Sequence, residues 1–328
     1  MDQFTRRDLL RLGAAAAAGL TAAEGAWAGE PAGDAAVRKG AGRRTRRLRI
    51  AHVTDVHVQP ELEAERGMAA CLHHVQSQKD KPDVILNGGD ALMDLCAVDR
   101  ARAKTQWDCW NGTLKRECSM RVEHCIGNHD IWGIAKSESR CDGSEDFYGK
   151  KWALDGYGIT RPYRSFDLQG WHFIVLDSTM PVVESYVGRL DETQFEWLAD
   201  DLKKTDAKKP VLILSHIPIL SAAVFYDGEL EKTGKYEVPP GWLHIDSRRI
   251  KNLFLQHPNV NVCLSGHLHL IDRVEYNGVT YLCDGAVSGN WWKGAHQECH
   301  EGYALVDLYN DGTIEREYVT YGWQAKKA

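Results

Sequence analysis

Five short polar clusters, each placed directly after an apolar run, constrain the fold of this 328-residue chain more than any other feature. The apolar runs have the length and composition of buried strands: RIAHVT runs into Asp55, and VLILS runs into His216. Open α/β sheets bind their ligands beyond the carboxyl ends of the strands, so clusters distant in sequence can converge on one edge. The clusters are Asp55-Val56-His57, Gly88-Gly89-Asp90, Gly127-Asn128-His129-Asp130, Ser215-His216 and Gly266-His267-Leu268-His269.

The spacing inside the clusters favours convergence of their side chains. Residues two apart in extended chain point to the same side, which aims Asp55 with His57 and His267 with His269. Glycines precede several of these residues and permit sharp turns close to a ligand. The sequence therefore predicts one compact polar site.

The residue types in the clusters indicate a metal site. Several imidazoles with two carboxylates and an amide oxygen suit first-row transition metals such as Mn, Fe or Zn, whereas Mg²⁺ and Ca²⁺ prefer oxygen ligands. A carboxylate that bridges two cations holds them roughly 3.5–4 Å apart, the separation at which a shared hydroxide forms and attacks phosphorus in line. The hypothesis is a binuclear centre that hydrolyses phosphate esters.

The motif order D-x-H, G-D, G-N-H-D, H, G-H-x-H resembles the calcineurin-like metallophosphoesterase superfamily, from about Leu48 to the C-terminus. The resemblance implies an α/β fold, a four-layer αββα sandwich with the binuclear site at the strand carboxyl ends. It also implies two divalent or trivalent transition-metal ions (Mn, Fe or Zn) and a small-molecule phosphoester substrate.

The resemblance further implies a role for each residue of the site. Asp90 would bridge the two metals, and His129 would hydrogen-bond the substrate or protonate the leaving group, with Asp130 orienting it. The first metal would be held by Asp55, His57, Asp90 and His269, and the second by Asp90, Asn128, His216 and His267.

Departures from two branches of the superfamily narrow the substrate. Met93 and Asp94 stand where Ser/Thr protein phosphatases carry Asp and Arg, and Asp130 stands where they carry Glu. Met93 also replaces the tyrosine of purple acid phosphatases. What remains resembles the broader phosphodiesterase-type and nucleotide-pyrophosphatase-type branch, and the segment Gly285–Trp292 resembles exported bacterial members. Phosphodiesters or pyrophosphates are expected in preference to phosphoproteins, with phosphomonoesters also open.

Three other functions compete with this prediction. One is a phosphoprotein phosphatase, and another is a non-catalytic interaction scaffold with the same fold, which would have no need of seven intact ligands. A zinc hydrolase of C–N or C–O bonds would require an H-x-H-x-D-H or H-E-x-x-H core, which the chain lacks.

The N-terminus predicts export. Arg6 and Arg7 form a twin-arginine pattern ahead of a weakly apolar stretch, and Ala26-Trp27-Ala28 offers a cleavage site. Residues 1–28 are read as a Tat signal peptide, 29–47 as a basic linker and 48–328 as one phosphoesterase domain. The Tat translocase is then a partner, and the destination is periplasmic or extracellular. The apolar stretch is too short for a stable membrane span, and a net charge of −6 without a basic stripe argues against nucleic-acid binding.

Alternating β-rich and helical segments agree with an α/β domain. The stretch 132–165 has no clear periodicity and is expected to form a functional loop. Strands are predicted at 48–54, 84–87, 122–126, 172–177, 211–215, 260–264 and 280–283. Helices are predicted at 61–77, around 100–115, at 192–204 and at 248–256.

Several other residues have both a structural and a functional interpretation. His52 is expected to be a packed core residue, and Thr54 and Asn87 to hydrogen-bond near the ligands. Trp291 and Trp292 are either core anchors or a stacking platform, and His296 and His300 lie near them in sequence.

Overall fold

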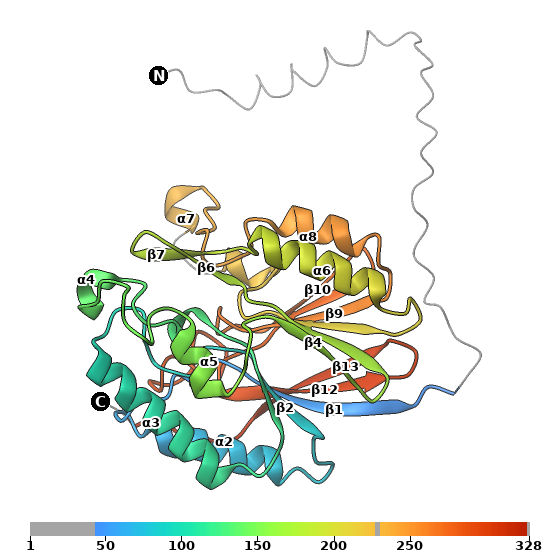
Figure 1. Cartoon of the computed structure of the whole chain (residues 1–328). Coiled ribbons are helices and arrows are strands. Elements are labelled where there is room, and N and C mark those ends of the chain that lie inside the picture. The colour runs from blue at the N-terminus through green and yellow to red at the C-terminus, as the bar shows by residue number, and fades with distance from the viewer. Residues whose placement is uncertain (1–42, 227–229, 327–328) are drawn as a thin grey trace, which may run out of the picture. The chain divides into compact units, whose positions relative to one another are not determined.

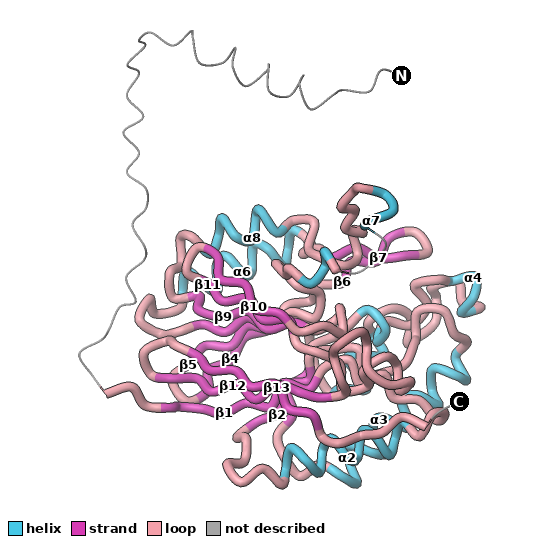
Figure 2. Tube along the Cα trace, turned by 180° about the vertical axis from the view of Figure 1, so that it is seen from behind, coloured by secondary structure: helices cyan, strands magenta, loops and turns pink. Residues whose placement is uncertain are grey.

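The computed structural model describes residues 43–226 and 230–326, and the predicted signal peptide and most of the linker lie outside these residues. Two β-sheets face each other, and a pair of helices covers the outer face of each (Figure 1; Figure 2 shows the opposite side). The four-layer αββα prediction is thereby confirmed.

The first sheet has the order β13-β12-β1-β2-β3, in which β1, β2 and β3 run parallel and β12 and β13 are antiparallel additions. Its strands are β1 (Arg46–Val53), β2 (Val84–Asn87), β3 (Val122–His124), β12 (Gly302–Tyr309) and β13 (Ile314–Thr320).

The second sheet has the order β10-β11-β9-β8-β5-β4, with a parallel centre from β11 to β5 and an antiparallel strand at each edge. Its strands are β4 (Arg164–Leu168), β5 (Trp171–Val175), β8 (Val211–Leu214), β9 (Val260–Ser265), β10 (Asp272–Tyr276) and β11 (Val279–Cys283). A separate hairpin pairs β6 (Thr179–Val182) with β7 (Ser185–Gly188).

The helices are α2 (Ala64–Gln76), α3 (Arg100–Glu117), α4 (Lys136–Ser139), α5 (Lys151–Tyr157), α6 (Glu192–Lys204), α7 (Leu230–Thr233) and α8 (Ser247–Phe254). Side-chain caps begin two of the longer ones: Asp191 accepts from the Gln194 amide at 2.7 Å, and Asp99 accepts from the Arg102 amide at 2.9 Å. No helix of the described residues is long and apolar enough to cross a membrane.

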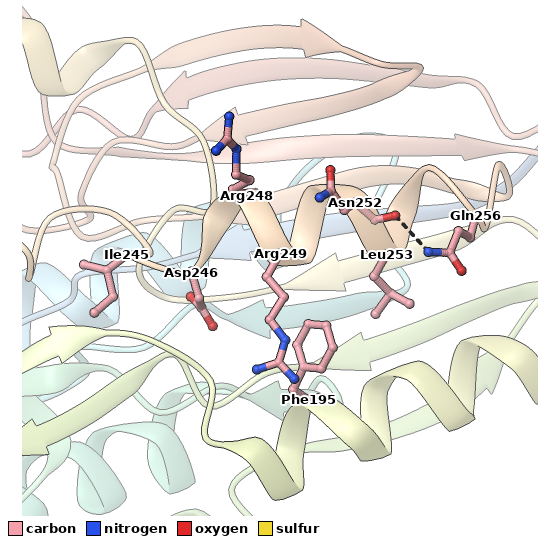
Figure 3. Close-up of a pocket in the computed structure, with 8 residues that line it drawn as sticks. All are labelled: Phe195, Ile245, Asp246, Arg248, Arg249, Asn252, Leu253 and Gln256. Atoms are coloured by element: carbon pink, nitrogen blue, oxygen red, sulfur yellow. Dashed lines mark hydrogen bonds between the residues drawn. The ribbon is translucent and has the colours of Figure 1, made fainter.

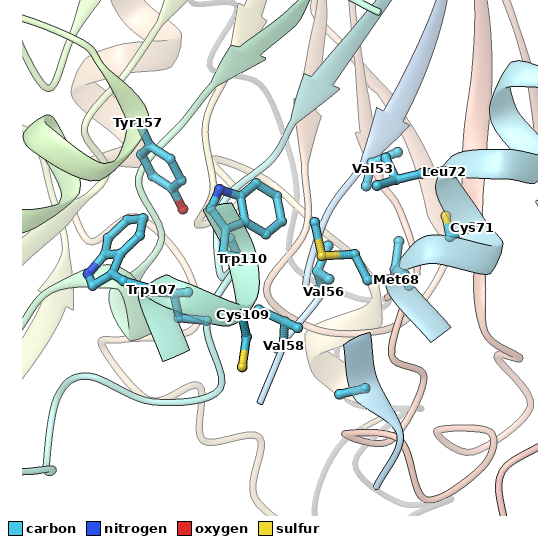
Figure 4. Packing of buried hydrophobic residues seen from close by; sticks show 14 of the residues in the cluster. Val53, Val56, Val58, Met68, Cys71, Leu72, Trp107, Cys109, Trp110 and Tyr157 are labelled. Atoms are coloured by element: carbon cyan, nitrogen blue, oxygen red, sulfur yellow. The ribbon is translucent and has the colours of Figure 1, made fainter. Parts of the chain in front are cut away.

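Three apolar clusters separate the layers. Ile50 and Val306 of the first sheet meet Phe173 and Leu212 of the second in the inter-sheet core. Beneath α2 and α3, Met68 and Trp110 pack around Val56 (Figure 4), whereas α6 and α8 bury their apolar faces on the outer side of the second sheet. With one packed core between the sheets and one under each helical layer, the strand ends are held in a rigid frame.

Six strands were not predicted: β4, β6, β7, β10, β12 and β13. The strands β10 and β13 lie at sheet edges. Their sequences, DRVEY and IEREYVT, are rich in charged residues and lack the apolar run from which the other strands were predicted. The segment 132–165, predicted to be irregular, contains α4 and α5 and the start of β4. In Figure 1, β1 runs from right to left, and α4, α5 and the β6–β7 hairpin gather at the left, where β1 ends.

Candidate metal centre

The structure brings all seven predicted ligand residues together, because the carboxyl ends of five parallel strands meet at one edge of the sandwich. The ligands follow β1, β2, β3, β8 and β9 along the chain. The ligand atoms of Asp55, His57 and His269 lie within 4.8 Å of one another and form the first group. Those of Asp90, His216 and His267 do the same and form the second group, with Asn128 beside them.

In the first group, two ring nitrogens face each other. His57 Nε2 lies 3.0 Å from His269 Nε2, which lies 3.5 Å from Asp55 Oδ1. The carbonyl of Gly289 lies 2.6 Å from His269 Nδ1, so this nitrogen donates and Nε2 faces the site. Lone pairs and a carboxylate that converge in this way form a cation site.

The second group repeats this arrangement. The Gly88 carbonyl accepts from His216 Nδ1 at 2.9 Å, which leaves Nε2 to face the site. His216 Nε2 lies 3.1 Å from Asp90 Oδ2 and 3.1 Å from Asn128 Oδ1. Three acceptor atoms directed at one another require a cation or a proton between them. Mixed nitrogen and oxygen donors fit a transition metal in both groups.

Asp90 lies between the two groups. Its Oδ2 atom is 3.8 Å from His57 Nε2 in the first group and 3.1 Å from His216 Nε2 in the second. The other oxygen accepts from the His129 amide at 2.8 Å, which fixes the orientation of the carboxylate. This is the position that a bridging ligand needs, and the bridging role itself stays a prediction.

The charge states of four of these ligands suit ligation, whereas His216 carries a proton that a metal ion would have to displace. Burial, with a contribution from the neighbouring histidines, lowers the pKa of His57 and of His267 to about 3, so both rings are neutral. Burial opposes ionisation of Asp55 and Asp90, but the pKa of each lies below its ordinary value because His269 and His216 respectively favour the carboxylate. Burial also disfavours charge on His216, but Asp90 outweighs it and raises the pKa to about 9.

Backbone strain is concentrated at the ligands. Asp55, His57, Asp90, His267 and His269 all have positive φ, between 47° and 73°, in the left-handed region that ordinary residues avoid. Such conformations cost on the order of 1–3 kcal/mol each and cluster at functional sites. Nearby glycines permit the close approach of the backbones, since a Cβ at Gly127 would lie 2.1 Å from Asp90 Oδ1 and one at Gly266 would lie 2.2 Å from Asp55 Oδ2.

The predicted supporting residues contact the site differently. Thr54 donates its hydroxyl to Asp55 Oδ2 at 2.6 Å, so it holds a ligand directly. Asn87 accepts from the Gly89 amide at 3.3 Å and lies 3.2 Å from His124 Nδ1, so it supports the turn before Asp90 and not a ligand side chain.

His129 lies at the edge of the centre, close enough to His57 and Asp90 to form a third group with them. The prediction that Asp130 orients it is wrong. The buried carboxylate of Asp130 accepts instead from four backbone amides and braces the turn around Asp90; the donors are Asp90, Ala91, Leu92 and Gly127, at 2.8–3.3 Å.

The carboxylate that faces the His129 ring belongs to Asp94, at 3.7 Å from Nδ1. Burial alone would lower the pKa of His129, but Asp90 and Asp94 raise it to about 9. Sequence reasoning had noted Asp94 only as a departure from the protein phosphatases. A chemical signal could have identified Asp94: a histidine that donates a proton in catalysis needs a carboxylate beside its ring.

The two tryptophans, predicted to be either core anchors or a stacking platform, differ in their surroundings. Trp292 is buried, donates to the His57 carbonyl at 3.0 Å and packs against Trp323, so it is an anchor. Trp291 is partly exposed, with its ring centroid 4.6 Å from that of His269 and 6.0 Å from that of His296. Tyr186 of β7, which the sequence did not indicate, lies 6.3 Å from His267 by the same measure.

Most of the remaining histidines are structural. His52 is buried and pairs with Asp284 at 2.7 Å, as expected of a core residue. His172 lies between Asp167 and Asp201, at 2.7 and 2.8 Å. All nine cysteines are unpaired.

A surface groove of about 500 Å³ lies between α6 and α8, and none of the ligands lines it (Figure 3). Its central contact is the guanidinium of Arg249, which lies 3.7 Å from the ring centroid of Phe195 and pairs with Glu192. The groove contains no predicted site residue.

A family model described as calcineurin-like phosphoesterase matches residues 48–270. A 3′,5′-cyclic-nucleotide phosphodiesterase of Nostoc is 26% identical over 161 residues, which are 48% of this chain and 54% of that protein. The chain thus spans about half the length of this relative. A probable glycerophosphodiester phosphodiesterase of Arcobacter nitrofigilis is 22% identical over 242 residues, 71% of this chain and 76% of that protein.

Among solved structures, a dimetal phosphatase from Danio rerio superimposes with a TM-score of 0.53 at 18% identity, over 85% of this chain and 100% of that one. At this identity the likeness concerns the fold alone.

Proposed function

The chain belongs to the calcineurin-like phosphoesterase family, and from that premise we propose that it is an exported hydrolase of phosphoric esters that prefers phosphodiesters or pyrophosphates. The single observation that carries the proposal is the place of Asp90 between two buried groups of histidine and carboxylate ligands. An ester phosphate that reaches this edge meets two cation sites at once.

Two transition-metal ions held there would polarise a phosphoryl oxygen and stabilise the charge that develops on it. Asp55, His57 and His269 would hold one ion, Asn128, His216 and His267 the other, and Asp90 both. His129 then holds a proton at the edge of the site, and we assign it to the leaving oxygen. Asp94 keeps the ring oriented and favours its protonated form, the role that had been expected of Asp130.

The local charges support a substrate with one negative charge per phosphorus. Among the described residues, the charged side chains that most shift the pKa values of the site residues are aspartates and histidines. Lys150 is engaged elsewhere, with Asp177 and the Thr179 carbonyl. Besides the protonated His129, a phosphomonoester dianion gains most from a further cation such as a lysine or arginine, whereas a diester needs only the metals. The two phosphodiesterase relatives agree with this preference.

The test is reconstitution of the purified protein with Mn²⁺, Fe²⁺ or Zn²⁺ separately, followed by assay on a panel of mono-, di- and pyrophosphoesters and phosphopeptides. We expect the highest kcat/KM on a diester or pyrophosphate. Phosphopeptide turnover far above all other substrates would overturn the substrate proposal. No hydrolysis of any ester by the metal-loaded protein would favour the interaction scaffold.

Export is proposed on separate grounds, the Arg6–Arg7 pair and the Ala26-Trp27-Ala28 site in the segment outside the described residues. Substitution of both arginines by lysine is expected to retain the protein in the cytoplasm, because a Tat signal is read through that pair. Cell fractionation measures this, and unchanged export of the double variant through the Tat pathway would refute it.

A further inference from the structure

Trp291 is an aromatic side chain that the metal centre itself does not require. It is not one of the ligands, and it is partly exposed where Trp292 is buried. Its ring centroid lies 4.6 Å from that of His269 and 5.9 Å from that of His57, both in the first ligand group. The indole therefore forms a wall directly beside one of the two cation sites.

The backbone holds Trp291 there against its own preference. The residue has φ of 48° and Trp292 has φ of 68°, so two consecutive bulky residues occupy the left-handed region. Strain of this kind persists only where the surroundings over-determine the conformation, and it concentrates at functional sites. A tryptophan that served only as filler would not need such a backbone.

The surroundings that over-determine the loop are visible. The Trp292 amide donates to the Ser288 carbonyl at 2.7 Å and its indole to the His57 carbonyl at 3.0 Å, which ties the loop to a ligand residue. Behind it, Trp323 packs edge-to-face on Trp292, and Tyr321 donates to the Val287 carbonyl at 2.7 Å. One tryptophan anchors the loop so that the other is presented at the site.

The aromatic surroundings of the two ligand groups differ. On the first, His296 stands at 81° to the Trp291 ring, with centroids 6.0 Å apart, and adds a second flat side chain that can hydrogen-bond. On the second, the aromatic side chain that approaches His267 among the described residues is Tyr186, whose ring is steeply inclined at 76° and whose centroid lies 6.3 Å away. A flat wall with a polar neighbour suits a planar organic group better than a flexible alkyl chain, because every aromatic ring or nucleobase has a π-face to stack.

We propose that Trp291, with His296 at its edge, binds a planar unsaturated group esterified to the substrate phosphorus and so selects aryl or nucleoside esters over alkyl esters. The inference rests on the proposed phosphoesterase function and names the substrate class of the same site. The competing role is structural, in which Trp291 only keeps His57 and His269 in place. That role would affect every substrate equally.

The experiment compares metal-loaded parent protein with Trp291→Leu and Trp291→Phe. Calorimetry measures the binding of phenylphosphonate and ethylphosphonate, neither of which can be hydrolysed as an ester. Kinetics use three diesters with one aliphatic leaving group, the S-ethyl phosphorothiolates that carry an O-ethyl, an O-phenyl or an O-(thymidin-5′-yl) group, and follow the ethanethiol released. The last two separate a simple aryl preference from a nucleoside preference. Metal content is measured for each variant, and Tyr276→Leu, at an exposed aromatic on the edge strand β10, is the matched control.

For Trp291→Leu we expect roughly tenfold weaker phenylphosphonate binding, equivalent to about 1.4 kcal/mol and at the low end of stacking on an aromatic side chain. Ethylphosphonate binding should change less than about twofold, metal content should not change, and Trp291→Phe should recover most of the loss. Kinetically, KM should rise for the phenyl or thymidine ester but not for the ethyl ester.

Equal losses for both phosphonates, or loss of metal, would assign Trp291 the structural role and overturn the proposal. Unchanged binding of both would overturn it as well. If the parent protein binds neither phosphonate and cleaves no ester, the proposed function fails first and this inference falls with it. If the parent cleaves all three esters with equal KM, the proposed function stands and this inference alone is refuted.

Discussion

The ligand edge and the inter-sheet core are built from the same strands but differ in backbone conformation and in buried charge. In β1, Ile50 is buried in the core with an ordinary backbone, while Asp55, just beyond the strand, has a left-handed backbone and a buried charge. No residue of the inter-sheet cluster has positive φ, whereas five of the seven ligand residues do. The packed core thus stabilises the fold and tolerates a strained, charged edge. Substitutions should separate the two regions, one changing activity and the other changing stability.

The largest effect is expected at Asp90, in the ligand edge with its strained backbone. Asp90→Asn keeps the shape of the side chain but removes the charge that both ligand groups share. Activity should fall below about 10⁻⁴ of the parent, beyond the loss of a single proton donor, which costs ~10²- to 10⁴-fold. Metal analysis should show fewer than two tightly bound ions, with the free energy of unfolding of the metal-free protein little changed. Two tightly bound ions in the variant would rule out the bridge. Asp108→Asn, which breaks only an exposed pair with Lys104, is the control.

The second-largest effect is expected in the inter-sheet core, where the backbone is not strained. Phe173 is buried between the sheets and stacks on Phe166. Phe173→Ala should lower the free energy of unfolding by about 3–5 kcal/mol, through lost burial and the cavity left behind. Activity per folded molecule should stay near that of the parent. Denaturant titration measures the first and active-site-normalised assay the second, with Leu255→Ala at an exposed position as control. Loss of metal binding at full folding would show that core and edge are not separable.

The third effect examines proton transfer at the edge. His129→Ala should lower kcat by about 10²-fold or more for diesters with alkoxide leaving groups, which need a proton, and far less for nitrophenolate. Equal losses across leaving groups would remove His129 from the acid role.

Asp94→Asn should show the same dependence on the leaving group at a smaller size, about tenfold, as expected of a residue that orients another. In the double variant the two effects should not add, because Asp94 acts through His129. Additive losses would separate Asp94 from this pair.

The smallest effect lies outside both regions, at His172 of β5. Burial of this imidazole would lower its pKa, but hydrogen bonds to Asp201 and Asp167 outweigh burial and raise it. A pKa raised in the folded state contributes stability that is full below the unfolded value of about 6.5 and is lost as pH rises through the folded pKa. Denaturant unfolding near pH 6 and pH 9 should show this loss in the parent and a weaker dependence in His172→Gln. An unchanged profile in the variant, with exposed His73→Gln as control, would contradict the assignment.

Sequence reasoning reached most of the site, because metal chemistry demands particular residue types, and strand ends are readable from apolar runs that stop at a polar residue. Sequence reasoning predicted fewer of the strands. It missed β12, although most of its residues are buried, and it missed the edge strands β10 and β13, whose charged residues interrupt the apolar pattern. It assigned the wrong carboxylate to His129. Adjacency in sequence favoured Asp130, but the chain turns that side chain back onto the amides around Asp90.

By itself the sequence determined the α/β layering and the membership of a phosphoesterase family, and it predicted the ligand set, since these depend on which residues are present and in what order. Only the tertiary structure decided that Asp94 faces His129, that Trp292 is an anchor while Trp291 lines the site, and that Asp90 lies between the two ligand groups. These are properties of direction and distance. They are set by left-handed backbone at the strand ends, a conformation that residue type disfavours and that the packing of the two sheets imposes.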